Sequence, residues 1–165
     1  MKKTLAALAA LLISAQTSAW ADAVGGDSIG YGVAVASGLH NVAAVSASIN
    51  PGAIDRQLAR ASGTVYLFLG TNNVAGGVPV SNVRAIVNFA HARGIHLVWV
   101  GPPCMNKSRF GKYVSRFDAG LGAAVRGAGA SYVSLNAREH CTLARSSDGV
   151  HFSGSGYHTV WGMVH

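Results

Sequence analysis

The segment Thr64-Val-Tyr-Leu-Phe-Leu69, followed by Gly70-Thr-Asn-Asn73, decides the fold that we expect for this chain. The first six side chains are β-branched, aromatic or aliphatic, which is typical of a β-strand. Continuous apolar runs of this kind occur where a strand is buried on both faces of a parallel sheet. The glycine and the small polar residues that follow end the strand. We therefore expect a central strand over residues 64–69, in a sheet covered on both sides.

Other short apolar runs flank this strand, and helix-like segments separate them. This alternation indicates βαβ units with right-handed crossovers, and therefore an α/β protein. We expect a three-layer α/β/α sandwich around a flavodoxin-like, five-stranded parallel sheet, with ligands bound beyond the carboxyl ends of the strands. The other expected strands cover 23–24, 42–46, 95–100 and 132–135, and the expected helices cover 29–39, 53–61, 80–93, 111–126 and 154 onward.

Residues 1–21 have the pattern of a secretory signal peptide. A positively charged start precedes the apolar run Leu5–Ile13, which is shorter than the roughly 18 residues that a spanning helix needs. Ala19-Trp-Ala21 then provides a small-x-small cleavage site. We expect export to the periplasm or the medium of a bacterium, a single mature domain over 22–165, and no stable membrane insertion.

The composition is basic, with a formal net charge of +7 at pH 7, and removal of the two lysines at positions 2 and 3 leaves +5. Such a balance favours contact with acidic polymers, for example anionic cell-wall material. The cations are scattered, and the densest group, Lys107–Arg116, accompanies no nucleic-acid-binding motif. This group is either the solvated start of a helix or an anion-facing patch. We expect a monomer without a nucleic-acid partner.

The chain contains two cysteines, Cys104 and Cys141. In an oxidising compartment such a pair usually forms a disulfide. The closed loop of 37 residues would stabilise the fold by roughly 3–4 kcal/mol in the chain-entropy treatment. Two cysteines alone make a poor metal site, and we expect no metal.

The segment Gly26-Asp-Ser28-Ile-Gly30 comes after the first expected strand and opens a helix. Ser28 would lie at the sheet edge, where a helix N-terminus favours a developing negative charge. On its own the segment is more typical of an ordinary turn or helix cap than of a nucleophile. Its Gly-x-Ser-x-Gly pattern also matches the nucleophile elbow of α/β-hydrolases. That fold is disfavoured because its nucleophile follows several strands, whereas Ser28 follows the first.

Two further segments bring polar side chains to the same expected edge. In Asp148-Gly-Val-His151 a histidine can act as the base that a hydroxyl nucleophile needs. The aspartate three residues earlier can fix the tautomer of that histidine and stabilise its imidazolium form. After the central strand, the side-chain amide of Asn72 can donate to an oxyanion. Taken singly, each segment also fits ordinary turn chemistry.

In this order, the segments resemble the SGNH (GDSL-type) hydrolase family, whose motifs are Gly-Asp-Ser, a glycine after the second strand, Gly-x-Asn-Asp and Asp-x-x-His. The resemblance covers essentially all of the mature chain. It implies a serine esterase with no cofactor, in which Ser28 is the nucleophile. It further implies that His151 is the general base and that Asp148 orients it.

The resemblance also implies an oxyanion hole made by the backbone N–H of Ser28 and the side chain of Asn72. A third donor would be a backbone N–H in the second motif, for which Gly52 is favoured and Ala47 is the alternative. The family has an aspartate where this chain has Asn73, which puts the rigidity of that loop in doubt.

Export and the small size of the domain favour short acyl esters, acetyl above all, of small molecules or cell-envelope polysaccharide. One alternative is a lysophospholipase or thioesterase that acts on longer acyl chains. A second alternative is a catalytically inactive envelope-binding domain with the same fold.

Overall fold

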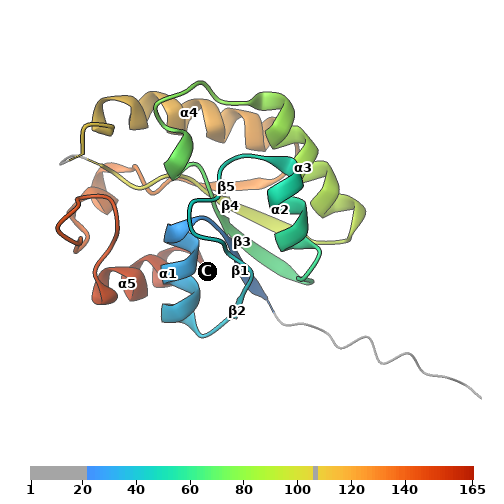
Figure 1. Ribbon diagram of the computed structural model, residues 1–165, viewed down its shortest axis with the longest axis horizontal. Helices are drawn as coiled ribbons and strands as arrows, with labels where there is room; N and C mark the ends of the chain where they lie inside the picture. The colour runs from blue at the N-terminus through green and yellow to red at the C-terminus, as the bar shows by residue number, and fades with distance from the viewer. Residues whose placement is uncertain (1–21, 106–107) are drawn as a thin grey trace, which may run out of the picture.

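The computed structural model describes residues 22–105 and 108–165, so the predicted signal peptide over 1–21 lies outside the described residues. The described chain forms one five-stranded sheet in which every neighbouring pair is parallel (Figure 1). The strand order, β2-β1-β3-β4-β5, is the flavodoxin-like order that the sequence predicts. The strands are β1 (Ala23–Gly26), β2 (His40–Asn41), β3 (Thr64–Phe68), β4 (His96–Val100) and β5 (Ser131–Val133).

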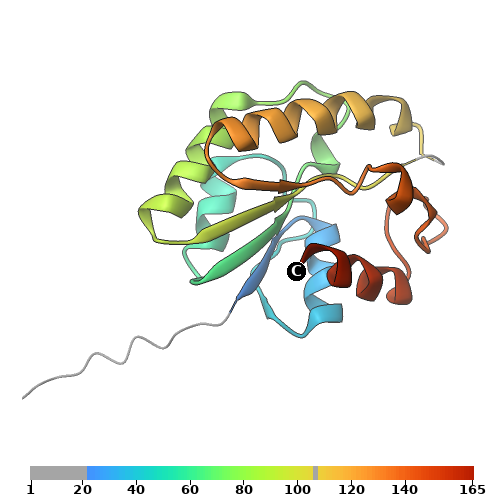
Figure 2. The same ribbon diagram turned by 180° about the vertical axis from the view of Figure 1, so that it is seen from behind.

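Helices cover both faces of the sheet, and each face has its own apolar core (Figures 1 and 2). The larger core packs Leu67 and Trp99 of the sheet against α2, α3 and α4. The smaller core packs Val24 and Phe68 against α1 and α5. The three-layer α/β/α architecture is therefore as predicted. The helices are α1 (Ser28–Ser37), α2 (Pro51–Leu58), α3 (Val80–Ala92), α4 (Gly111–Gly127) and α5 (Gly154–Val164).

Helix boundaries follow from capping residues. The Asp27 side chain accepts from the N–H of Ile29, and Gly38 ends α1 in the left-handed conformation with φ 72°. Asn50 caps α2, and Ser153 caps α5. Asp27 and Ser153 each fix the end of a segment that carries a candidate site residue, so the caps also position the site.

The predicted strand over 42–46 is wrong, since the regular strand ends at Asn41. The Asn41 side chain accepts from the N–H of Ala43, and Ser46 has a positive φ of 66°. A turn closed by the N–H of Ala47 and the carbonyl of Ala44 then takes the chain away from the sheet. The apolar composition of this segment reflects burial of Val42 alone, because residues 44–46 are exposed.

The carboxyl ends of the central strands lie level with one another. Gly26 pairs with Phe68, which in turn pairs with Val100. The segments that follow β1, β3 and β4 therefore emerge at one edge of the sheet. Among the described residues, no helix is both long and apolar enough to cross a membrane.

Candidate active site

The candidate triad consists of Ser28, His151 and Asp148, which the fold brings into contact at the carboxyl edge of the sheet. Ser28 is the first residue of α1, directly after β1. Its Oγ lies 2.9 Å from Nε2 of His151, although the two residues are 123 positions apart in the chain. Nδ1 of His151 lies 2.6 Å from Oδ2 of Asp148. The three groups thus form one chain of hydrogen bonds from hydroxyl to imidazole to carboxylate.

Asp148 is held in place by its own loop. Its Oδ1 accepts from the backbone N–H groups of Val150 and His151 at 2.9 and 3.0 Å, and from the hydroxyl of Ser146 at 2.8 Å. The hydrogen bond from the His151 ring, followed by that from the Val150 N–H, holds the pKa of Asp148 well below its usual range. The group facing His151 is therefore an ionised carboxylate, which stabilises an imidazolium ring.

Arg145 and Phe152 close the loop that carries Asp148 and His151. The two residues form an isolated antiparallel bridge, and the guanidinium lies 3.9 Å from the centroid of the Phe152 ring. Nη1 of Arg145 also donates to the Val150 carbonyl at 2.9 Å. The short Asp-x-x-His segment is thereby fixed at both ends.

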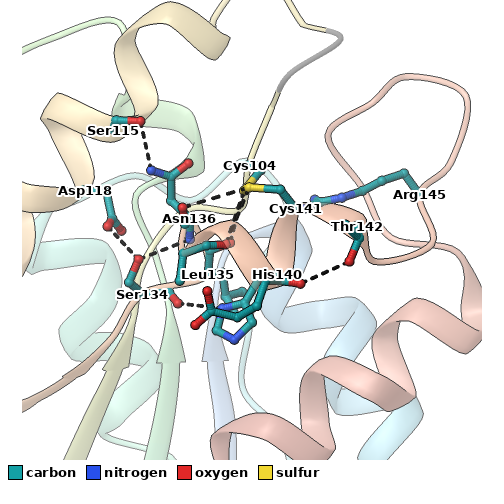
Figure 3. Close-up of a disulfide and its surroundings, with 12 residues drawn as sticks. Cys104, Ser115, Asp118, Ser134, Leu135, Asn136, His140, Cys141, Thr142 and Arg145 are labelled. Carbon is teal, nitrogen blue, oxygen red and sulfur yellow. Dashed lines mark hydrogen bonds between the residues drawn. A yellow bond between two sulfur atoms is a disulfide. The ribbon is translucent and has the colours of Figure 1, made fainter.

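A disulfide joins Cys104 to Cys141, as the sequence predicts. Cys104 follows β4, whereas Cys141 lies in the 3₁₀ helix Arg138–Thr142 that follows β5 (Figure 3). Near this link, Nδ1 of His140 lies 2.9 Å from the Ser134 carbonyl oxygen. The bond therefore ties together two loops of the carboxyl edge, immediately before the candidate triad loop.

Gln57 supports the turn that leads from Gly26 to Ser28, a role that the sequence did not reveal. Its side chain is only 4% exposed, and its Oε1 accepts from the N–H of Gly26 at 2.7 Å. Its Nε2 donates to the carbonyl of the same residue at 3.1 Å. One amide side chain thus pairs with both polar groups of the last residue of β1. The available signal was a polar residue beside Ile54 and Leu58, at the core-facing spacing of α2.

Asp27 connects the first turn of α1 to the segment after β3. The residue is fully buried, with Oδ1 accepting from the N–H of Ile29 at 2.9 Å and Oδ2 from that of Thr71 at 3.2 Å. Burial raises the pKa of its carboxyl from 3.8 to about 6, because desolvation outweighs these hydrogen bonds. The buried carboxyl of Asp27 thus links Ile29, in the first turn of α1, to Thr71.

The raised pKa of Asp27 predicts a pH-dependent stability. Between about pH 4 and 6 the unfolded chain loses this proton before the folded chain does, so folding stability falls as pH rises through that window. The rise of the Asp27 pKa from 3.8 to about 6 corresponds to a free energy of about 3 kcal/mol. We expect the stability difference between wild type and Asp27→Asn, measured by urea unfolding, to shift by this amount from pH 4 to pH 7.

Burial also raises the pKa of Asp55. Asp55 is present in both proteins, so its contribution to the pH dependence cancels in this comparison. Asp148 titrates below the window, because its pKa is lowered. An unchanged difference between the two proteins at pH 4 and pH 7 would show that Asp27 titrates normally.

The candidate oxyanion donors have different environments. Asn72 is exposed on the 3₁₀ helix Thr71–Asn73, and its Nδ2 donates to the Ala47 carbonyl at 2.8 Å. The N–H of Ala47 itself donates to Ala44, so it is already engaged. Gly52 lies in the first turn of α2, where helical N–H groups lack an intrahelical acceptor. Within the described part of the chain, Gly52 makes no hydrogen bond to the candidate triad.

Asn73 retains a positioning contact at the place where the resemblance implies an aspartate. Its Oδ1 accepts from the N–H of Ile49 at 3.0 Å. Because an amide oxygen accepts as a carboxylate oxygen does, this link between the segment before α2 and the segment after β3 needs no negative charge. The described residues contain no group of three or more histidine, cysteine or acidic side chains that could hold a metal.

Comparison with known proteins bears on the fold of the chain. A family model described as "Protein of unknown function (DUF459)" matches residues 80–142. No curated protein matches the sequence. A GDSL-like lipase from Bacteroides thetaiotaomicron VPI-5482 superposes with a TM-score of 0.62 at 16% identity, over 87% of this chain and 84% of that chain. The psychrotrophic esterase EstA from Pseudoalteromonas sp., in a structure inhibited by monoethylphosphonate, superposes with a TM-score of 0.55 at 18% identity. The match covers 75% of this chain and 72% of that chain. These likenesses confirm the expected fold.

Proposed function

We propose that this chain, which has the fold of GDSL-like lipases and esterases, is a serine ester hydrolase of SGNH type. The single observation that carries the proposal is the unbroken hydrogen-bonded chain from Ser28 Oγ through the His151 ring to Asp148. This order of hydroxyl, imidazole and carboxylate supplies the activated nucleophile that acyl transfer needs.

In the first half of the reaction, Ser28 Oγ attacks the ester carbonyl carbon while His151 Nε2 takes the hydroxyl proton. Asp148 stabilises the resulting imidazolium through Nδ1. The carbonyl oxygen becomes an oxyanion, for which the Ser28 N–H, the second N–H of the Asn72 amide and the Gly52 N–H are the proposed donors. The intermediate collapses as the C–O bond of the alcohol breaks and His151 donates its proton to that oxygen.

In the second half, His151 takes a proton from water, and the hydroxide attacks the carbonyl carbon of the acyl-enzyme. Collapse of this second tetrahedral intermediate breaks the bond to Ser28 Oγ, and His151 returns the proton to the serine. The carboxylic acid then leaves. Every proton in the cycle passes through His151, so no metal or organic cofactor is needed.

The accessibility of the site supports a short acyl group on a larger alcohol. The side chains of His151 and Asp148 are 38% and 48% exposed. An open site of this kind suits an acetyl group presented on the surface of a polymer, and we propose cell-envelope polysaccharide as one source. The Cys104–Cys141 disulfide supports export, because disulfides persist in oxidising compartments.

The proposal is tested with p-nitrophenyl esters of two, four and eight acyl carbons, together with labelling by a fluorophosphonate. We expect the acetate to have the highest kcat/KM and the label to map to the peptide that contains Ser28. A maximum at eight carbons would instead indicate a lipase or thioesterase specificity. Absence of both hydrolysis and labelling would indicate an inactive binding domain.

A further inference from the structure

A cavity of about 590 Å³ lies between the segment 74–78 and the N-terminal half of α4, outside the candidate triad. Figure 1 shows the connection from β3 to α3 running beside α4. A Cβ placed on Gly120 of α4 would lie 3.3 Å from the Val78 side chain, which confirms how closely the two walls approach. The side chains that line the cavity include Val74, Val78, Lys112, Tyr113, Arg116 and Phe117.

The cavity combines an apolar floor with a cationic rim. Val74 and Phe117 are buried, whereas Lys112 and Arg116 are exposed. These two cations are four residues apart on α4, so they project from the same side of the helix. No lining residue is acidic. Among the described residues the only ion pair joins His151 to Asp148, so neither rim cation has a carboxylate partner.

The helix itself adds to the positive potential of the rim. Lys112 is the second residue of α4, and Phe110 at the N-cap provides no side-chain hydrogen bond to the first turn. A lysine there faces the positive end of the helix dipole, which is unfavourable for its charge. The Lys112 ammonium lies 4.9 Å from the Tyr113 ring centroid. A bound anion would relieve the mutual repulsion of these groups.

The lining of the cavity is continuous along the chain with a segment of the candidate active site. Val74 directly follows the 3₁₀ helix Thr71–Asn73, and the Thr71 N–H donates to Asp27, next to Ser28. The segment that carries Asn72 therefore continues directly into the lining of the cavity. A substrate that extends from the ester along this segment would meet the cavity.

We propose that this cavity binds an anionic group, a carboxylate, sulfate or phosphate, on the alcohol part of the substrate. The inference rests on the proposed ester hydrolysis and adds the charge class of the substrate. An acetyl group carries no charge, so the anion belongs to the alcohol. Lys112 and Arg116 bind the anion, while Tyr113 and Phe117 pack against the apolar part that carries it.

The kinetic test compares 6-acetoxy-2-naphthoate with the neutral 6-acetoxy-2-naphthamide. The ratio of their kcat/KM values cancels changes that affect both esters. We expect Lys112→Gln/Arg116→Gln to lower this ratio about tenfold, mainly through KM, since two exposed charge contacts are lost. Arg84→Gln removes the same type of charge from the exposed face of α3, and we expect it to leave the ratio within twofold.

Two results would overturn the inference while leaving ester hydrolysis intact. One is an unchanged ratio in the double variant with a wild-type unfolding midpoint. The other is an equal fall in Arg84→Gln, which would show that the overall positive field of the protein acts and not this cavity.

A binding measurement separates failure of this inference from failure of the proposed function. The reaction product 6-hydroxy-2-naphthoate is titrated into wild-type protein and followed by fluorescence and by backbone amide shifts. We expect shifts at Gly76, Gly77 and Lys112, and a Kd about tenfold weaker in the double variant. If neither ester is cleaved, the proposed function fails. The titration still tests whether the cavity binds an anion. Absence of binding at millimolar concentration would contradict the anion site.

Discussion

Replacing Ser28 with alanine is expected to lower kcat for p-nitrophenyl acetate by about 10⁴- to 10⁶-fold, which is the scale of loss when a serine nucleophile is removed. The Oγ that lies 2.9 Å from His151 Nε2 is the only hydroxyl in contact with that nitrogen among the described residues. Without it, no acyl-enzyme forms, and fluorophosphonate labelling is lost together with turnover. Stopped-flow and steady-state hydrolysis assays measure the first effect, and intact mass measures the second.

The matched control for this variant is Ser81→Ala, on the exposed start of α3. We expect it to retain wild-type activity and labelling. Ser28→Ala should fold normally, because α1 is capped by the Asp27 side chain and not by Ser28. Substantial activity in a folded Ser28→Ala protein would mean that another group is the nucleophile and that the proposed mechanism is wrong.

Asp148→Asn is expected to lower kcat by about 10⁴-fold, the loss associated with a wrong histidine tautomer. Oδ1 of Asp148 accepts three hydrogen bonds, from two backbone N–H groups and the Ser146 hydroxyl. The amide oxygen of an asparagine would take this position, because only an oxygen can accept those bonds. The NH₂ group would then face Nδ1 of His151 and force the ring proton onto Nε2.

With its proton on Nε2, His151 cannot accept the Ser28 proton, so the base is lost although the geometry is kept. Nitrogen-15 chemical shifts of the ring identify the tautomer directly. Glu139→Gln, an exposed acidic residue of the preceding 3₁₀ helix, is the matched control, with activity expected within twofold of wild type. An Asp148→Asn protein with the wild-type tautomer and wild-type kcat would remove Asp148 from the mechanism.

The sequence predicts much of the fold because two strands are continuous apolar runs with clear ends. The segment 64–69 and the segment 95–100 each contain a central strand, and the glycine after each run fixes where polar residues emerge. For the same reason, residues that follow different strands could be expected at one edge of the sheet. That expectation needs only the parallel topology, not the details of packing.

Contacts between distant elements were beyond sequence reasoning. The pairing of Gln57 with Gly26 depends on how α2 packs against β1, which no local pattern specifies. The apolar residues directly after Asn41 read as the continuation of a buried strand, although only the first of them is buried. The sequence therefore did not reveal that β2 ends at Asn41. The role of Asn73 likewise emerges only from its partner Ile49, 24 residues away. In each case the deciding interaction is tertiary.

The packing of α5 against α1 joins the last helix of the described chain to the helix that begins at Ser28. Tyr157 of α5 lies against Gly32, where a Cβ would come within 2.3 Å of the tyrosine ring. In the proposed mechanism, a chain that lacks the segment carrying His151 has no general base and is inert towards esters. Ester hydrolysis would then report that α5 has docked on α1.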